Sequence, residues 1–205
     1  FKQFIIQSYR RYLLPKLPEI PDPDACAKAA SSKEIKTFAY QSFVRDYVQR
    51  PSPYRGVLVN HGLGSGKTCT SIASIEALYN ADPTKPVYVM TPASLSPNYK
   101  GEIAKCGPFV FRTDNFWTWV PIPKLSPFPP EADLFVNKLG IPIYVIKKQK
   151  GAWLPDPTKK SNFADMTADQ QAAVQNQIKQ HIEYRFQFIH YNGVTEKTVR
   201  SWACT

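Results

Sequence analysis

The spacing of apolar residues predicts two amphipathic helices near the start of the chain. The first lies at Lys2–Leu14 and the second at about Ile35–Gln49, where aromatic and aliphatic residues recur every three or four positions. This spacing places the apolar side chains on one face of each helix. Prolines crowd the stretch between the helices and predict an extended linker that reaches about Ser32, because proline cannot continue a helix.

Three short apolar runs predict the strands of a buried sheet. They lie at Val57–Asn60, Val87–Thr91 and Phe186–Tyr191. Helical patterns follow the first two runs, one at Thr68–Tyr79 and one after the turn that begins at Pro92. Strands that alternate with helices join through right-handed crossovers into a parallel sheet. We therefore predict an α/β fold for the chain from residue 34 onward.

Residues 107–165 interrupt this alternation. The segment is rich in proline and aromatic residues, and the one strand predicted within it lies at Ile141–Ile146. Such a stretch inside a compact domain indicates an insertion. Its aromatic side chains either build a small core or, beside Lys147–Lys150, contact a nucleic-acid strand by stacking and charge. Thr167–Gln170 then matches a capping box and predicts a helix through about Tyr184.

Composition adds a prediction about the partner. With 205 residues and 43% hydrophobic content, the chain can bury the core of one domain. Its formal net charge of +10 and its pI near 9.4 predict nucleic acid as an anionic partner, unless the charge only serves solubility. The four cysteines form no close pair, which predicts neither a zinc site nor a disulfide framework and favours an intracellular reducing compartment. No apolar run approaches the ~20 residues that span a bilayer, so we expect no membrane partner.

The segment Asn60–Thr68 indicates nucleotide chemistry. It places three glycines and a Lys-Thr pair between a predicted strand and a predicted helix. The glycines let backbone N–H groups turn toward phosphate oxygens, and the helix start adds further N–H groups and the positive end of its dipole. Lys67 can reach the β- and γ-phosphates of ATP, and the Thr68 hydroxyl can bind Mg²⁺. The alternative is a glycine-rich turn that binds nothing.

The predicted nucleotide-binding residues form one continuous run, in which Lys67 and Thr68 are the catalytic pair. The run consists of Gly62, Leu63, Gly64, Ser65, Gly66, Lys67, Thr68 and Cys69. The full phosphate-loop pattern has a glycine where this chain has His61, and superfamily 2 helicases often vary that position. We interpret His61 as a packing or loop residue rather than a catalytic base.

Three segments together resemble the N-terminal ATPase domain of superfamily 2 helicases, a RecA-like P-loop NTPase domain. They are the aromatic helix before Pro51–Gly56, the loop His61–Cys69, and the turn Thr91–Leu95 with Asn98 and Glu102 after it. The chain resembles in particular the helicase-like NTPases of large nucleocytoplasmic DNA viruses, which are related to the poxvirus early transcription factor small subunit. Phe188–Gly193 is similar to the strand that precedes the acidic motif in that group.

This resemblance implies roles for individual residues. Gln41 would read the adenine edge, since an amide can both donate and accept there, although it can equally be a solvated helix residue. The turn after the second strand would contact the nucleic-acid backbone through Thr91, Pro92, Ser94 and Asn98. N–H and hydroxyl donors at the start of a helix suit phosphate oxygens, which makes this role chemically reasonable.

The resemblance also implies that parts of the enzyme lie elsewhere. No Asp-Glu-x-His or Asp-Glu-Ala-Asp tetrad occurs in these residues. We therefore expect an N-terminal helix and linker at residues 1–33 and an incomplete RecA-like domain at residues 34–205. Such a piece of a longer protein would bind ATP and Mg²⁺ but hydrolyse ATP poorly by itself.

The implied function is the ATP-binding part of a viral nucleic-acid-dependent ATPase linked to transcription, in the virion and host cytoplasm. Its partners would be nucleic acid and the transcription machinery or other virion proteins. One alternative is a non-motor structural or transcription-assembly module that keeps a nucleotide-binding loop. Another P-loop enzyme, such as a kinase, is disfavoured by the basic charge and by the Pro92–Leu95 turn.

Overall fold

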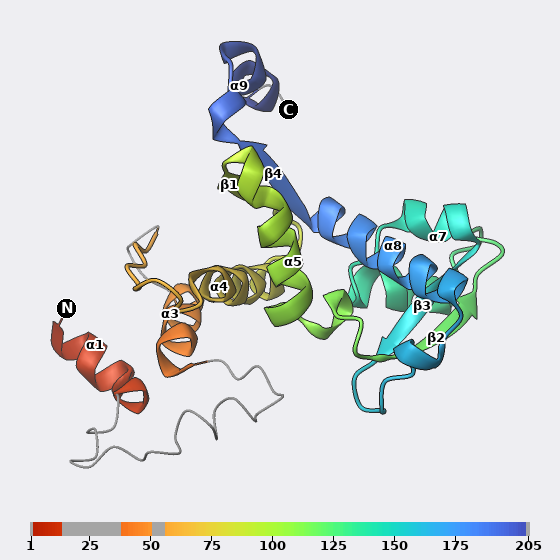
Figure 1. The fold of residues 1–205 in the computed structure, drawn as a ribbon, viewed down its shortest axis with the longest axis horizontal. Coiled ribbons are helices and arrows are strands. Elements are labelled where there is room, and N and C mark those ends of the chain that lie inside the picture. The colour runs from red at the N-terminus through yellow and green to blue at the C-terminus, as the bar shows by residue number, and fades with distance from the viewer. Residues whose placement is uncertain (1, 14–37, 51–55, 204–205) are drawn as a thin grey trace. The chain divides into compact units, whose positions relative to one another are not determined.

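The computed structural model describes residues 2–13, 38–50 and 56–203, and the chain divides into two compact units at residues 82 and 83 (Figure 1). The predicted proline-rich linker and the predicted boundary between residues 33 and 34 lie outside the described residues. No helix within the described ranges is long and apolar enough to cross a membrane. Each unit has secondary structure and buried side chains of its own.

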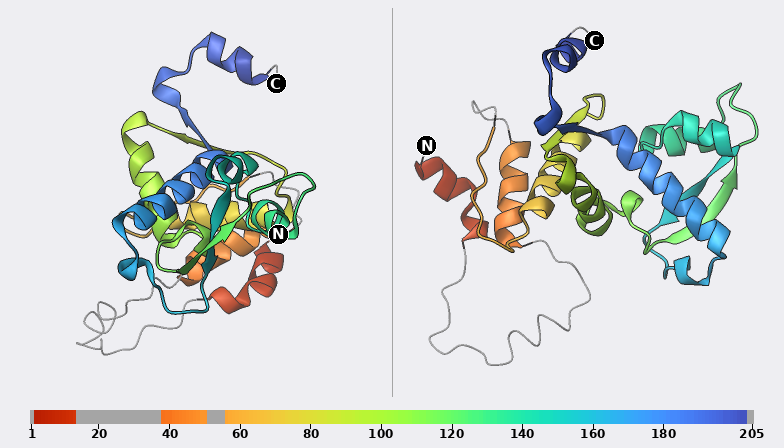
Figure 2. Two further views of the ribbon diagram at one scale, coloured as in Figure 1. Left: turned by 90° about the vertical axis from the view of Figure 1, so that its right-hand side faces the viewer. Right: turned by 45° about the horizontal axis from the view of Figure 1, so that its top comes forward.

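The first unit is helical in its described part. The predicted N-terminal helix is formed by α1 at Lys2–Ser8 and the 3₁₀ turn η1 at Arg10–Tyr12. The second predicted helix is α3 at Ala39–Gln49, and the helix predicted after the phosphate loop is α4 at Lys67–Ala81. Helices α3 and α4 pack side by side, as the right-hand view of Figure 2 shows.

The N-terminal segment is anchored on α3 by aromatic rings and one carboxylate. Tyr9 is buried, and its ring lies 5.0 Å from the ring of Phe43 in an edge-on contact. Asp46 accepts hydrogen bonds from the side chains of Arg11 and Tyr12. Burial raises the pKa of Asp46, but hydrogen bonds from Tyr12 and Arg45 and the nearby positive charges hold the pKa below its usual value.

The predicted strand at Val57–Asn60 is not formed, so that prediction was wrong. Residues 56–60 have irregular backbone, and the side chain of Leu58 is 93% exposed. A strand is stabilised by ladder hydrogen bonds to a neighbouring strand. Among the described residues, no strand pairs with this segment. An apolar run alone therefore did not produce a strand here.

The second unit contains the predicted parallel sheet. Strand β1 (Val87–Thr91) pairs with β4 (Phe186–His190) in parallel, with Val89 beside Phe188. After β1, the 3₁₀ turn η2 (Ala93–Leu95) leads into α5 (Ser96–Cys106). The mixture of helices with a parallel pair of strands confirms the α/β class and is consistent with the RecA-like fold that we predicted.

The segment between α5 and β4 is more regular than we predicted. It contains the antiparallel strands β2 (Phe116–Pro121) and β3 (Gly151–Asp156). The remaining elements of residues 107–165 are the 3₁₀ turns η3 (Phe109–Phe111) and η5 (Phe163–Asp165), helices α6 (Pro130–Asp133) and α7 (Ile143–Gln149), and the π-helical turn η4 (Leu134–Lys138).

The strand that we predicted at Ile141–Ile146 is therefore wrong, because most of this run belongs to α7. The buried residues Ile141, Val145 and Ile146 follow helical spacing. A short continuous apolar run does not distinguish a buried strand from a buried helix by its periodicity.

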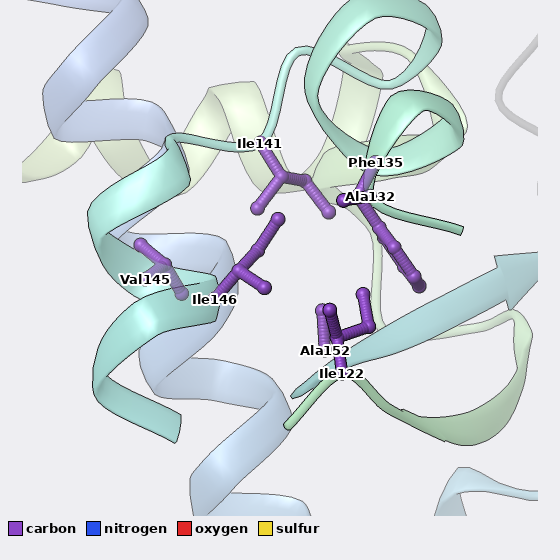
Figure 3. Close-up of a cluster of buried hydrophobic side chains, with 7 residues drawn as sticks. All are labelled: Ile122, Ala132, Phe135, Ile141, Val145, Ile146 and Ala152. Atoms are coloured by element: carbon purple, nitrogen blue, oxygen red, sulfur yellow. The ribbon is translucent and has the colours of Figure 1, made fainter. Parts of the chain in front are cut away.

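Residues 107–165 also build a hydrophobic core, which Figure 3 shows. Side chains from α6, η4, α7 and β3 converge there, together with one residue that follows β2 and one that precedes α7. The cluster consists of Ile122, Ala132, Phe135, Ile141, Val145, Ile146 and Ala152. Phe111 and Trp117 are also buried, so aromatic residues of this segment serve a core, as one of our two alternatives expected.

Helix α8 (Ala168–Arg185), blue in Figures 1 and 2, packs against β3. The predicted capping box is formed, since Thr167 Oγ1 accepts a hydrogen bond from the Gln170 N–H and the Gln170 side chain accepts one from the Thr167 N–H. Gln177 joins α8 to β3 by donating to the carbonyl and accepting from the N–H of Trp153, both at 2.8 Å. After β4, the 3₁₀ turn η6 (Tyr191–Gly193) leads to α9 (Glu196–Ala203).

His181 is a buried polar residue of α8. Its ring lies 4.7 Å from the ring of Phe111. Burial, together with the charge of Arg185, lowers the pKa of His181 to about 3, against a hydrogen bond with the backbone of Gly140 that raises it. The imidazole is therefore neutral in the folded protein at neutral pH.

Candidate nucleotide-binding site

The phosphate loop, residues Asn60–Thr68, turns directly into α4. Gly64 and Gly66 have φ angles of +75° and +74°, a region that glycine adopts more readily than other residues. Gly66 is the N-cap of α4, and no side chain caps this end of the helix. The first N–H groups of a helix have no acceptor within the helix. Those of Lys67, Thr68 and Cys69 are therefore suited to an anion.

The ammonium group of Lys67 lies over the loop. It donates to the carbonyl oxygen of Gly62 at 2.9 Å and to that of His61 at 3.4 Å. The Ser65 hydroxyl donates to the same Gly62 carbonyl at 2.7 Å. Charged phosphate oxygens accept stronger hydrogen bonds than neutral carbonyls do. A bound phosphate would therefore compete well for Lys67, and the loop fits the triphosphate that its sequence predicts.

Gln41 of α3 connects that helix to the phosphate loop. Its side-chain oxygen accepts from the backbone N–H of Phe38 at 2.9 Å, and its side-chain N–H₂ donates to the carbonyl of Gly66 at 3.2 Å. The residue is only 5% exposed, so the alternative of a solvated helix residue is wrong. Both ends of the amide are engaged within the protein, and its predicted contact with adenine stays a prediction.

Tyr40 holds the other side of the loop, a role that we did not predict. Its hydroxyl donates to the carbonyl of Ser65 at 2.7 Å, and its ring meets that of His61 edge-on at 4.9 Å. His61 therefore packs against an aromatic ring, in line with our interpretation. The signal in the sequence is an aromatic hydroxyl next to Gln41 on a helix that precedes the loop.

The remaining loop residues differ in exposure. Leu63 is fully exposed at the tip, whereas Thr68 and Cys69 are half-buried in the first turn of α4. Thr70 is buried, and both its N–H and its hydroxyl donate to the Gly66 carbonyl, at 3.0 Å and 3.1 Å. The carbonyl of Gly66 therefore receives hydrogen bonds from α3 and from α4. The Mg²⁺ contact of Thr68 stays a prediction.

The predicted nucleic-acid turn lies in the second unit, between β1 and α5. Thr91 is buried, and its hydroxyl donates to the carbonyl of Pro92 at 2.8 Å. Ser94 in η2 and Asn98 in the first turn of α5 are exposed. The structure thus brings the four predicted residues into one turn, and two of them offer exposed polar side chains.

The chain is similar to two proteins of Acanthamoeba polyphaga mimivirus. It is 34% identical over 95 residues to "Putative ATP-dependent RNA helicase R350", and this aligned region covers 46% of this chain and 11% of that protein. It is 29% identical over 103 residues to "Putative ATP-dependent RNA helicase R563", and this aligned region covers 50% of this chain and 17% of that protein. No family model matches the chain, and no solved structure matches it significantly.

These similarities support the resemblance to helicase-like NTPases of large DNA viruses. The chain spans less than a fifth of either mimivirus protein. The relationship to the poxvirus transcription factor stays a prediction.

Proposed function

We propose that this chain is the ATP-binding part of a nucleic-acid-dependent ATPase of the superfamily 2 helicase or translocase class. The observation that carries the proposal is the phosphate loop. In this loop, Gly64 and Gly66 have positive φ angles, and no side chain caps the start of α4. The ammonium group of Lys67 lies beside them. The similarity to two proteins named as putative ATP-dependent RNA helicases supports the assignment of this loop to the helicase class.

In this proposal, the loop residues bind and orient the triphosphate. Backbone N–H groups at the start of α4 contact phosphate oxygens, and Lys67 exchanges its carbonyl partners for phosphate. Thr68 contributes a hydroxyl to Mg²⁺, which neutralises phosphate charge when it is bound. Tyr40 and Gln41 hold the loop from α3 by their hydrogen bonds to Ser65 and Gly66.

The proposed nucleic-acid contact uses the phosphate backbone rather than the base sequence. The net charge of +10 and the exposed Ser94 and Asn98 support this assignment. Each neutralised phosphate releases counterions, so the affinity would fall steeply with salt. A function in viral transcription, with virion proteins or transcription machinery as partners, completes the proposal.

The test is Lys67→Ala in the full-length protein that contains this chain. A charge-assisted hydrogen bond contributes about 1.5–3 kcal/mol, so ATP affinity or turnover should fall tenfold or more. Lys197→Ala on the exposed face of α9 is the matched control and should leave both unchanged. Equal ATP titration and turnover in the Lys67 variant would refute the proposed site. Normal ATP binding by the wild type without nucleic-acid-stimulated turnover would favour the structural module instead.

A further inference from the structure

The second unit contains a pocket between α5 and α8 that includes none of the phosphate-loop residues. Its volume is about 420 Å³. Helix α5 lines it with Pro97, Lys100, Gly101 and Ala104, and α8 with Gln175, Ile178, Lys179, Ile182 and Glu183. The four residues of α5 and the first four of α8 follow the spacing i, i+3, i+4 and i+7, which places them on one face of each helix. We call this cavity the α5–α8 pocket.

The pocket has an apolar floor. Ile178 and Ile182 are nearly fully buried and belong to its wall, together with the buried ring of Phe111. Gly101 leaves space on the opposite wall, because a Cβ atom built there would meet no atom within 4 Å. A flat apolar group can therefore enter without displacing backbone.

The rim of the pocket is positively charged on one side. Lys100 pairs with Glu183 at 3.2 Å and joins α5 to α8. Lys179 is exposed, and it makes no ion pair with any residue in the described part of the chain. An apolar floor beside the exposed ammonium group of Lys179 is complementary to a ring that carries an anionic group. A nucleotide within a strand has this chemistry.

We propose that the α5–α8 pocket receives one unstacked base of a single-stranded nucleic acid whose backbone lies on the turn before α5. Pro97 lines the pocket and neighbours Asn98, and Asn98 is three residues from Gly101, so the two share one helix face. A step of about 4.5 Å along the helix axis thus separates the predicted backbone contact at Asn98 from the pocket wall at Gly101. The inference rests on the proposed function and adds to it a contact with a base.

The pocket would hold the base by apolar contact rather than by reading its edge. Its floor offers aliphatic side chains and few polar groups, so it does not distinguish one base from another by hydrogen bonds. The phosphate next to the bound base would lie near Lys179. Such binding tolerates any sequence, as expected for an ATPase that acts along a strand.

The decisive experiment fills the pocket in the full-length protein. Gly101→Leu projects a side chain into the free space, and Gly101→Ala is the matched control that adds one methyl group. The probes are twelve-nucleotide DNA and RNA strands with one internal 2-aminopurine, whose fluorescence rises when that base leaves the stack. Circular dichroism and thermal melting verify that both variants fold.

The wild type and Gly101→Ala should show the fluorescence rise on binding, and Gly101→Leu should lose it with an affinity about tenfold lower. Equal affinity and equal fluorescence in Gly101→Leu would overturn the inference while leaving the proposed function intact. Failure of the wild type to bind either strand would overturn the proposed function itself. If only an apolar dye loses binding in Gly101→Leu, the pocket serves another ligand and the inference is wrong. The DNA and RNA arms show which strand is preferred.

A second variant tests the phosphate contact at the rim. Lys179→Gln should reduce the slope of log affinity against log salt by about 0.7, the value for one phosphate of a single strand. Lys105→Gln is the control, because Lys105 lies on α5 outside the pocket and pairs with Glu102 at 2.9 Å. An unchanged salt slope in Lys179→Gln would exclude Lys179 from the contact.

Discussion

The hydrogen bonds of Gln41 allow a sharp test of how α3 controls the phosphate loop. Gln41→Met keeps a similar length and removes the hydrogen bonds to Phe38 N–H and to the Gly66 carbonyl. Neither partner would be left without hydrogen-bonding options. Phe38 is exposed, so water can reach its N–H, and the Gly66 carbonyl keeps both donors from Thr70. The loss is therefore the net value of two hydrogen bonds, about 1–2 kcal/mol.

Local opening of the loop is the quantity that this change affects most directly. Hydrogen exchange of a peptide spanning residues 60–72, measured in the full-length protein, reports the Thr70 amide that closes the first turn of α4. A loss of 1–2 kcal/mol accelerates exchange about 5–30-fold when reclosing is fast and exchange follows the opening equilibrium. Gln49→Met is the matched control, since Gln49 lies on the same helix and is exposed.

Gln41→Glu separates the hydrogen bond from the shape of the side chain. At pH 7 the carboxylate would face the Gly66 carbonyl in a buried position, so this variant should exchange faster than Gln41→Met. Burial raises the pKa of a carboxyl group, and the protonated form can donate to the carbonyl again. The deficit of Gln41→Glu relative to the wild type should therefore shrink as the pH falls toward 5.

Two results would refute this reasoning. Exchange in Gln41→Met equal to that of the wild type and of Gln49→Met would mean that α3 does not restrain the loop. A deficit of Gln41→Glu that stays constant from pH 7 to pH 5 would mean that donation to Gly66 has no energetic consequence. ATP affinity measured on the same variants shows whether a looser loop binds nucleotide more weakly.

Two further predictions concern stability. Gly66→Ala should lower the free energy of unfolding by about 1–2 kcal/mol or more, because φ is +74° and the new Cβ would lie 2.5 Å from Gln41 Nε2. Urea unfolding measures this loss, with Gly62→Ala as the control, because a Cβ atom at Gly62 would meet nothing within 4 Å. For His181, the folded pKa is lowered to about 3, so below pH 6.5 the unfolded chain binds a proton that the folded chain does not. Stability from this residue is present above pH 6.5 and falls by about 1.4 kcal/mol per pH unit toward pH 3. His181→Asn should flatten the acid side of a stability–pH curve, and an unchanged slope would exclude this role.

Local sequence alone determined several elements of this protein. Helix α4 after the glycine-rich loop, the capping box at Thr167 and the separate strand segments β1 and β4 are all confirmed. Each depends on side-chain spacing or on a hydrogen bond between residues a few positions apart. Such signals act over one or two turns of chain, and they can therefore be read without knowledge of the fold.

Tertiary structure decided the features that depend on distant neighbours. Val57–Asn60 has a strand-like composition, but no described strand pairs with it, and Ile141–Ile146 lies mostly in a helix because its apolar residues pack into a core built with α6 and β3. The hydrogen bond from Gln41 to Gly66 joins residues 25 positions apart. The α5–α8 pocket lies between two helices that are separated in the sequence by the whole segment from Gly107 to Thr167. Periodicity shows which face of an element is apolar. Only the folded chain determines which partner covers that face.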